Sequence, residues 1–495
     1  MNHKLKKLKP KIKNNWPILA ILLLAFILRL YRLHYPLLDW HSFRQADTAS
    51  VTREYLKNDQ LDLLHPQYHD LSNTQSGLDN PEGYRMVELP FINALIAQFL
   101  RLSQSLGFNF NLVIVSRLFS IIASLFAIYC LYRLIKLIDN RKLALLSALI
   151  YAILPYAVYY GRAVLPEPFM LAFSLLSLWQ WAAYCQKLSL ANNNLKKGKA
   201  LHYLLALFAL ALASLLKPFV VFLAPVYLAI AWHYLGKSLF KKIPIYLLPI
   251  LAFLPLLLWR EWITNFPEGI PASAWLFNSN NIRLRPAWWR WLFYERITKM
   301  LLGYIGIILL VANLFKSDRS RIIYAAWWLG IIGYFVVIAS GNIQHDYYQN
   351  LLIPLIAISI ARGSLIIQGK FSNKALGTLL ILLIISSSIL LSAQQIRGFF
   401  NVNTWEYAEA GEAVNRLTDK NSLVIAPAMS DTAFLFQTNR RGWPIGDNIE
   451  DKIARGATIY VSINDDSERR KLADKYEILE TGKRYLILDL TQEKK

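Results

Sequence analysis

The chain of 495 residues is 55% hydrophobic and only 17% charged, whereas soluble proteins carry roughly 25% charged residues. Long apolar runs account for this shortage, which excludes an ordinary soluble protein and predicts an α-helical polytopic membrane protein. Lys and Arg outnumber Asp and Glu by 54 to 32, but the cations lie mostly in short loops between apolar runs. There they face lipid headgroups, which argues against nucleic acid as a partner.

The apolar runs are long enough for about 11 membrane spans (range 10–13). They lie near 17–33, 112–135, 143–160, 168–186, 201–216, 218–235, 243–260, 299–315, 321–339, 349–363 and 375–393. A further segment, 89–102, is apolar on one face and is expected to lie in the membrane interface.

The charge of the short loops predicts the orientation, because Lys-rich and Arg-rich short loops stay in the cytoplasm. With the basic tail 1–16 inside, five further loops with three or four cations each are also inside: 133–142, 187–199, 237–242, 316–321 and 362–374. The short turns on the other side carry almost no cations. The N-terminus is therefore expected in the cytoplasm.

Three domains follow from this arrangement. Residues 1–16 form a cytoplasmic tail, and residues 17–395 form a transmembrane domain with outer loops 34–111 and 260–298. Residues 396–495 are expected to form a small extracytoplasmic α/β domain. Helices are predicted at 404–418 and 465–476 and strands at 422–428, 458–463 and 485–490.

The first outer loop opens with an unusual density of reactive groups, in the sequence YPLLDWHSFRQADTASVTR at 35–53. It contains two carboxylates, an imidazole, a guanidinium and an amide: Asp39, Asp47, His41, Arg44 and Gln45. A membrane anchor requires only a cation or an aromatic ring at the water boundary. This concentration of acid, base and anion-binding groups indicates chemistry at the membrane surface.

Other polar residues that are hard to explain structurally also fall on the expected outer side. They are Glu88, Arg162, Glu167, Lys217, His345, Asp346, Tyr347 and Tyr348. Residues that line a cavity between outer loops are expected to lie together on the outer side in this way. Arg and Lys can bind the phosphate of a lipid-linked donor, and a carboxylate can take the proton of an attacking acceptor. We therefore interpret Arg44, Arg162 and Lys217 as phosphate-binding. The residues interpreted as substrate-binding are His41, Gln45, Glu88, Glu167, His345, Asp346, Tyr347 and Tyr348.

Each residue also has a structural explanation. Arg44 and Arg162 can reach up to headgroups, Lys217 can mark a tight turn before Pro218, and Asp39 can cap the helix that begins near His41. No His, Asp or Glu set has metal-ligand spacing, so no metal and no cofactor is expected, although two outer-loop carboxylates are able to share a divalent ion.

On these motifs the chain resembles the GT-C superfamily of membrane glycosyltransferases. The similarity rests on HSFRQADTA after the first span, GRAVLPEP after the third, the Lys-Pro turn at 217–218 and HDYY before LLIPLIAI, and covers roughly 17–395. It is closest to the ArnT-like and protein-mannosyltransferase-like branch, which includes RgtA/B/C/D-like domains. The resemblance implies a bacterial inner membrane, an extracytoplasmic active site, a polyprenyl-phosphate sugar donor and an inverting transfer that needs a carboxylate in the first outer loop.

Many relatives in that superfamily carry an Asp-Glu pair in this loop, whereas this chain has Gln45 or Thr48 where a Glu is expected. The base is therefore Asp39 or Asp47. The pattern H-x-x-R-Q-x-x-T of the branch, in which the Asp47 position is less strict, favours Asp39 slightly. Asp47 also stands three residues after Arg44 and can form a structural ion pair with it.

The predicted function is transfer of a sugar from a polyprenyl-phosphate donor to a lipid, glycan or protein acceptor. Two alternatives stay open. A lipid-linked glycan flippase would show broken helices, repeats or charges deep in the spans, and none is evident. A ligase or polymerase that moves a whole oligosaccharide from a pyrophosphate carrier is not distinguished by the sequence.

Overall fold

The computed structural model describes residues 2–58, 61–190, 198–315 and 318–494. Parts of two expected inner loops, 191–197 and 316–317, lie outside the described residues. The chain divides into two compact units. The membrane unit comprises Met1–Tyr31, Ser120–Trp259 and Ser273–Gly398, and the loop–tail unit comprises Arg32–Phe119, Arg260–Ala272 and Phe399–Lys495. The first outer loop is thus grouped with the C-terminal tail.

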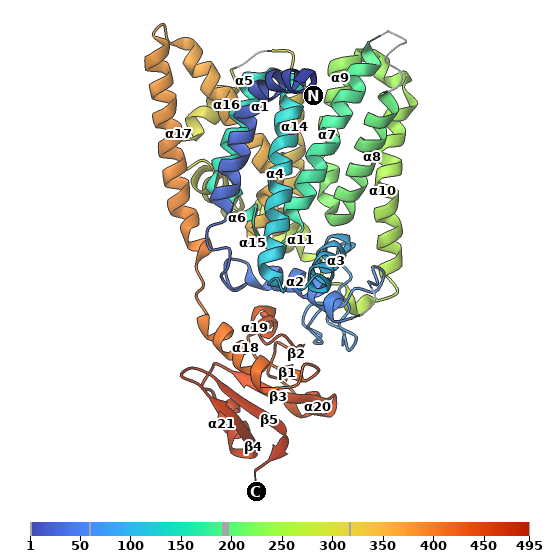
Figure 1. Ribbon diagram of the computed structural model, residues 1–495, viewed down its shortest axis with the longest axis vertical. Helices are drawn as coiled ribbons and strands as arrows, with labels where there is room; N and C mark the ends of the chain where they lie inside the picture. The colour runs from blue at the N-terminus through green and yellow to red at the C-terminus, as the bar shows by residue number, and fades with distance from the viewer. Residues whose placement is uncertain (1, 59–60, 191–197, 316–317, 495) are drawn as a thin grey trace. The chain divides into compact units, whose positions relative to one another are not determined.

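The membrane unit is a bundle of long helices that run side by side (Figure 1). Its α-helices, wholly or largely within this unit, are α1 (Asn2–Arg29), α4 (Leu112–Ile138), α5 (Arg141–Ile153), α6 (Pro155–Tyr160), α7 (Glu167–Ser189), α8 (Lys199–Leu216), α9 (Ala224–Leu235), α10 (Ile243–Ile263), α11 (Trp275–Asn278), α12 (Pro286–Trp289), α13 (Ile307–Asn313), α14 (Arg321–Val337), α15 (Ala339–Gln344), α16 (Ile353–Lys370) and α17 (Lys374–Ile396). Short 3₁₀ segments are η2 (Pro218–Leu223), η3 (Gly236–Lys241), η5 (Ser279–Leu284) and η7 (Asp346–Leu352), and η6 (Arg290–Leu301) is a π-helix.

Within the described ranges, six helical segments are long and apolar enough to cross a membrane. They are Leu112–Ile138, Lys199–Leu216, Pro218–Lys241, Ile243–Ile263, Asp346–Lys370 and Lys374–Leu417. Asn15–Arg29 and Arg321–Val337 are shorter apolar helices. The predicted class, a helical multi-span membrane protein, is confirmed.

Two predicted spans are interrupted, and local chemistry explains the first interruption. The span at 143–160 breaks at Leu154, because Pro155 begins α6 and has no N–H to continue α5. The buried guanidinium of Arg29 donates to the carbonyl oxygens of Ala152 (3.0 Å) and Ala157 (3.1 Å) around this break. The span at 299–315 begins in η6 and resumes as α13 only at Ile307.

Helices α13 and α16 approach each other closely at a glycine. A Cβ added to Gly363 in α16 would lie 1.8 Å from the carbonyl oxygen of Leu309 in α13. Gly369, in the last turn of the same helix, has no atom within 4 Å of the corresponding position. The sequence of α16 therefore holds one glycine that the packing requires and one that it does not.

The loop–tail unit is built on a five-stranded sheet in the order β2-β1-β3-β5-β4. The strands are β1 (Leu423–Ile425), β2 (Arg441–Trp443), β3 (Ala457–Ser462), β4 (Tyr476–Thr481) and β5 (Leu486–Glu493). Strands β2, β1 and β3 are parallel, and β5 is antiparallel to both β3 and β4. The helices are α2 (Ser42–Lys57), α3 (Phe91–Ser105), α18 (Trp405–Leu417), α19 (Thr432–Gln437), α20 (Ile449–Ala454) and α21 (Ser467–Lys475), with η4 (Pro267–Gly269) and η8 (Arg397–Phe400) as short 3₁₀ turns.

Both faces of this sheet are covered, and the alternation of side chains along each strand builds two cores. Val424 packs with Phe434 and Leu435 on one face. Ile425 packs with Trp443, Ile449, Tyr460 and Leu472 on the other. The helices and strands expected at 404–418, 465–476, 422–428, 458–463 and 485–490 are present as α18, α21, β1, β3 and β5. The sequence prediction missed β2, β4, α19 and α20.

The first outer loop joins the core of the tail. Leu71 belongs to the same apolar cluster as Trp443. Asp70 forms a parallel bridge with Gly442, through the bonds from Leu71 N to Gly442 O (2.8 Å) and from Gly442 N to His69 O (2.9 Å). Helix α3, expected as an interfacial helix, is amphipathic and exposes Leu95, Phe99 and Leu102.

The Asp70 carboxyl is fully buried beside this bridge. It accepts hydrogen bonds from the Ser72 backbone N–H (2.8 Å) and the Tyr68 hydroxyl (3.3 Å). Burial raises the pKa of Asp70 to about 7, and the nearby Asp47 carboxylate adds to the rise, although the hydrogen bonds act against it. The folded unit therefore binds a proton that the unfolded chain, with an Asp pKa of roughly 3.9, has already lost.

We expect Gly363→Ala to lower the thermal midpoint of the purified protein in detergent. Overpacking at a well-packed contact costs about 1–3 kcal/mol, and here the added methyl meets rigid backbone. Gly369→Ala is the matched control in the same helix, and it is expected to be neutral or stabilising by up to about 1 kcal/mol. Equal shifts for the two variants would contradict the close α13–α16 contact.

A second prediction concerns pH. Because the pKa of Asp70 is higher in the folded state, its contribution to stability is complete below about pH 4 and is lost as the pH rises toward 7. Asp70→Asn is expected to flatten this part of the dependence of the unfolding midpoint on pH. Asp474→Asn, at an exposed position in the same unit, serves as the control. If Asp70→Asn keeps the wild-type slope between pH 4 and 7, a raised pKa at this position is ruled out.

Candidate active site

Helix α2 carries the motif residues of the first outer loop and is buried along most of its length, although its sequence is polar. Its buried residues include Arg44, Gln45, Asp47, Arg53 and Glu54. Charged side chains are almost never fully buried unless they are paired. The helix begins after His41, which adopts a left-handed conformation (φ 57°), a region in which His is more common than most residues.

Asp39 is held from two sides. Its carboxylate accepts a 2.7 Å hydrogen bond from Gln45 Nε2 and forms an ion pair with Arg117 at 3.3 Å. Arg117, from α4, also donates to the carbonyl oxygens of Leu33 and Tyr35, so it fixes the chain that leads into the motif. Asp39 therefore links the motif to α4 rather than capping α2. Sequence reasoning missed Arg117, because it lies in an apolar run.

Asp47 lies at the meeting point of three segments of the loop–tail unit. Its Oδ2 pairs with Arg85 at 3.0 Å and accepts from Gln75 Nε2 at 3.1 Å. Its Oδ1 accepts from the Thr432 hydroxyl at 2.7 Å. The ion pair with Arg44 that the spacing suggests is not formed, because Asp47 pairs with Arg85 instead. The sequence pointed to neither Arg85 nor Thr432 as a partner.

Arg44 forms an ion pair with Glu88, so two residues singled out from the sequence are in contact. Both line a small hollow whose lining residues all belong to the loop–tail unit. The residues around it are Arg44, Asp47, Thr48, Val51, Arg85, Val87, Glu88, Pro90 and Asn93. Two carboxylates and two guanidiniums thus share one hollow, whereas Asp39 is absent from its lining.

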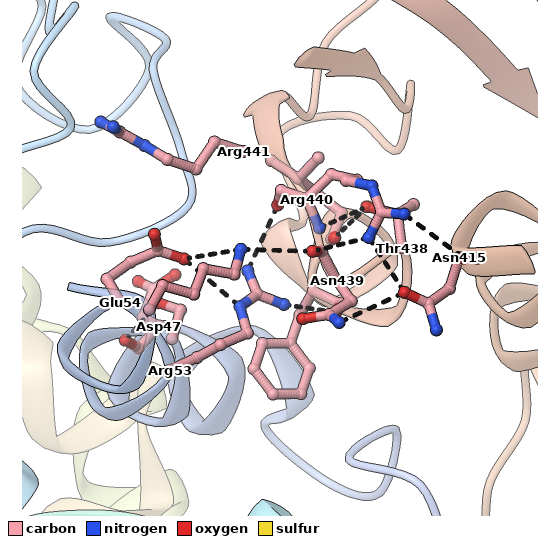
Figure 2. A network of polar contacts seen from close by, with 12 residues as sticks. Asp47, Arg53, Glu54, Asn415, Thr438, Asn439, Arg440 and Arg441 are labelled. Atoms are coloured by element: carbon pink, nitrogen blue, oxygen red, sulfur yellow. Dashed lines mark hydrogen bonds and ion pairs between the residues drawn. The ribbon is translucent and has the colours of Figure 1, made fainter. Parts of the chain in front are cut away.

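A second polar network lies further along α2 (Figure 2). Arg53 pairs with Glu54 and donates to the carbonyl oxygens of Phe436 (2.9 Å) and Arg440 (3.2 Å) in the tail. Burial lowers the pKa of Arg53, whereas the Glu54 carboxylate acts in the opposite direction. Burial and the neighbouring Arg53 also lower the pKa of Lys57 to about 8. This network is a second set of contacts between α2 and the tail, in addition to the hydrogen bond between Asp47 and Thr432.

In the membrane unit, Glu167 and Lys217 form an ion pair at 3.4 Å. Glu167 begins α7, and Lys217 stands between α8 and η2. The Lys217 ammonium also lies 6.0 Å from the centre of the Tyr348 ring. The structure thus brings together three residues of the predicted set.

Asp346 is completely buried in the same unit. It accepts from the Tyr160 hydroxyl at 2.5 Å and pairs with Arg296 at 3.5 Å, while the Tyr156 hydroxyl donates to its backbone carbonyl. Arg296 lies in the segment 260–298, which the sequence predicts to be an outer loop. A π-helix carries it, and π-helical turns are frequent at functional sites.

Arg162 is 1% exposed and donates to the carbonyl oxygen of Tyr31. Its guanidinium therefore lies inside the unit rather than on its outer surface. The ring of His345 contacts three aromatic rings, with centroid distances of 5.3 Å to Trp275, 5.2 Å to Tyr347 and 5.9 Å to Tyr348. Among the described residues, no group of three or more His, Cys, Asp and Glu is placed to hold a metal ion.

A known protein family matches part of the sequence, and solved structures match the fold over nearly the whole chain. Residues 90–259 match the family described as dolichyl-phosphate-mannose-protein mannosyltransferase. No curated protein sequence matches the chain.

Three solved structures share the fold. ArnT from Cupriavidus metallidurans bound to undecaprenyl phosphate has a TM-score of 0.62 at 12% identity, over 96% of this chain and 98% of that chain. The same enzyme in the apo state has a TM-score of 0.58 at 11% identity, over 95% and 96%. The Archaeoglobus fulgidus oligosaccharyltransferase, in complex with Zn and sulfate, has a TM-score of 0.58 at 10% identity, over 90% and 67%.

At these identities the structural likeness establishes the fold, and the family match concerns residues 90–259. The resemblance drawn from the motifs is therefore confirmed in two respects: residues 90–259 match the protein mannosyltransferase family, and the chain has the same fold as ArnT.

Proposed function

We propose that the chain transfers one sugar from a polyprenyl-phosphate carrier to an acceptor on the extracytoplasmic side of a bacterial inner membrane. The observation that carries this proposal is the hollow shared by Asp47, Glu88, Arg44 and Arg85 in the loop–tail unit. Carboxylates supply a proton acceptor, and guanidiniums bind and stabilise anionic oxygens. The charge alternation of the short loops supports the orientation, and the ArnT relative was solved with undecaprenyl phosphate bound.

In the proposed reaction, an acceptor oxygen or nitrogen attacks the anomeric carbon of the donor and the bond from that carbon to the phosphate oxygen breaks. The carboxylate takes the proton from the acceptor, and the carrier phosphate leaves with the bonding electrons. Attack from the face opposite the phosphate inverts the anomeric configuration. The acceptor is a lipid, a glycan or a protein.

We assign the base to Asp47 rather than Asp39. Asp47 lines the hollow, while the Asp39 carboxylate is enclosed between Gln45 and the fully buried Arg117. A general base needs contact with the group whose proton it takes. Asp39, with Gln45, then supports the start of α2, and His41 and Glu88 are assigned to substrate binding next to Arg44.

Arg162 and Lys217 are assigned to the donor phosphate. The Lys217 ammonium has three N–H donors, and its ion pair with Glu167 leaves capacity for an anion. Tyr347, Tyr348 and His345 form an aromatic group of the kind that packs against a sugar or a polyprenyl chain, with the buried Asp346 behind them.

The role of Asp47 is tested by sugar transfer. Purified protein is given undecaprenyl phosphate carrying radiolabelled mannose, glucose or galactose, together with a membrane extract as acceptor. Asp47→Asn is expected to lower kcat by about 10²–10⁴-fold, because it removes the proton acceptor. Asp39→Asn is expected to lower stability more than kcat, and the exposed Asp62→Asn serves as the control.

Full activity of Asp47→Asn would refute its role as base. The same assay with diphosphate-linked donors distinguishes this function from the transfer of whole oligosaccharides, since only monophosphate donors are expected to react.

The role of Lys217 is tested by binding of undecaprenyl phosphate to the purified protein. Lys217→Met keeps much of the apolar stem and removes the charge, and the Kd is expected to rise by roughly 10- to 100-fold, the effect of losing a charged hydrogen bond. The exposed Lys241→Met is the matched control. An unchanged Kd for Lys217→Met would exclude Lys217 from the phosphate site.

A further inference from the structure

Thr432, at the start of α19 in the tail, contacts the carboxylate to which we assign the chemistry. Its hydroxyl lies 2.7 Å from Asp47 Oδ1 and 3.2 Å from the Phe43 carbonyl oxygen. A hydroxyl has one proton to donate, and a bond to an ionised carboxylate is shorter and stronger than one to a neutral carbonyl. The shorter contact therefore receives the proton. Thr432 is 1% exposed, so solvent does not compete for this hydroxyl.

The two oxygens of Asp47 have different partners. Arg85 and Gln75 both bind Oδ2. Among the residues that the structure describes, Thr432 is the side chain that donates to Oδ1. Rotation of the Asp47 carboxylate about its Cβ–Cγ bond would exchange the two oxygens, and the hydrogen bond from the Thr432 hydroxyl opposes that rotation. The oxygen that does not face the Arg85 cation is thus held in one place.

The local backbone fixes Thr432 before any packing is considered. Met429 and Ser430 both have positive φ values, 50° and 71°, which are uncommon for residues other than glycine. Asp431 then turns the chain into α19, since its N–H bonds to the Ala428 carbonyl (2.9 Å) and its side chain accepts from the N–H of Ala433 (2.8 Å). Such strained turns persist where the surrounding structure over-determines them, typically at functional sites.

Packing then fixes α19 on α2. Phe434 and Leu435 are buried in the core of the tail. At the other end of α19, Arg53 donates to the Phe436 carbonyl, and its guanidinium lies 4.8 Å from the centre of the Phe436 ring. Helix α19 is therefore attached to α2 at both ends, and the attachment at its first residue is the Asp47 carboxylate itself.

We propose that Thr432 is a positioning residue of the transferase, through which the C-terminal tail orients the Asp47 carboxylate for proton transfer. The inference rests on the proposed role of Asp47. It gives the tail a part in the reaction beyond a scaffold or an acceptor-binding module. A misplaced catalytic group costs rate rather than affinity, so kcat is the quantity that this contact controls.

The test compares three variants of the full-length protein in the transfer assay with undecaprenyl-phosphate-linked sugars. Thr432→Val keeps the shape and removes the hydroxyl, and it is expected to lower kcat by about 10- to 100-fold with an unchanged KM for the donor. Thr432→Ser restores the hydroxyl and is expected to recover most of the rate. Thr438→Val is the matched control, because Thr438 is equally buried and donates to a backbone carbonyl, that of Leu435.

Both valine variants lose a buried hydrogen bond, so both are expected to lower the thermal midpoint. Only Thr432→Val is expected to lower kcat. If the two variants lower kcat equally, or if serine fails to rescue, Thr432 has a structural role only and the inference is overturned.

Asp47→Asn separates this inference from the proposed function. If Asp47→Asn is inactive and Thr432→Val has a normal kcat, the positioning role fails and the proposed function stands. If Asp47→Asn is fully active, the proposed function fails, and the positioning role fails with it.

Discussion

The burial of a charged helix is the constraint on which the loop–tail unit depends. Helix α2 places Arg44, Asp47, Arg53 and Glu54 out of water. An unpaired charge in such a setting costs several kcal/mol, so each side chain requires a partner of opposite charge or hydrogen bonds: from donors for a carboxylate, to carbonyl oxygens for a guanidinium. No single neighbouring segment supplies all of them. The partners come from the first loop, from the tail and from α2 itself, and meeting this requirement brings distant parts of the chain into one compact unit.

The same constraint explains the polar residues inside the membrane unit. The buried Arg362 of α16 pairs with Asp139 and Asp318, each at 3.2 Å, although the sequence predicts it at the start of an inner loop. Arg29 is satisfied by the carbonyls beside a proline break, and Asp346 by Arg296 and Tyr160. At Arg29 a backbone break and a buried charge compensate each other, whereas at Arg362 and Asp346 buried charges are paired with each other.

Features governed by local pattern could be predicted from the sequence. Apolar length identified the multi-span class, and alternation identified β1, β3 and β5 in the tail. The motif residues Arg44 and Glu88 do meet, as do Glu167 and Lys217. The six residues of α19 are too few for a helical period, and β2 has one apolar residue in the sequence RGW, whereas the equally short β1 lies in the longer apolar run 422–428.

The partners of the motif residues could not be predicted, because they are set by tertiary contact. Thr432 is 385 positions from Asp47 and lies in a stretch with no recognisable motif. Arg117 is hidden in an apolar run, and its role appears only when α4 is placed beside Asp39. The preference of the sequence for Asp39 as the base rested on a family pattern. Its enclosure by Gln45 and Arg117 is a property of the fold.

The central claim, that Asp47 is the carboxylate at the reacting centre, is tested most directly by a structure with a non-transferable donor, an undecaprenyl phosphonate sugar. We predict that the anomeric carbon of the bound sugar lies beside the Asp47 carboxylate, with Oδ2 still paired to Arg85 and Oδ1 to Thr432. A sugar bound beside Asp39, or remote from both carboxylates, would contradict the assignment.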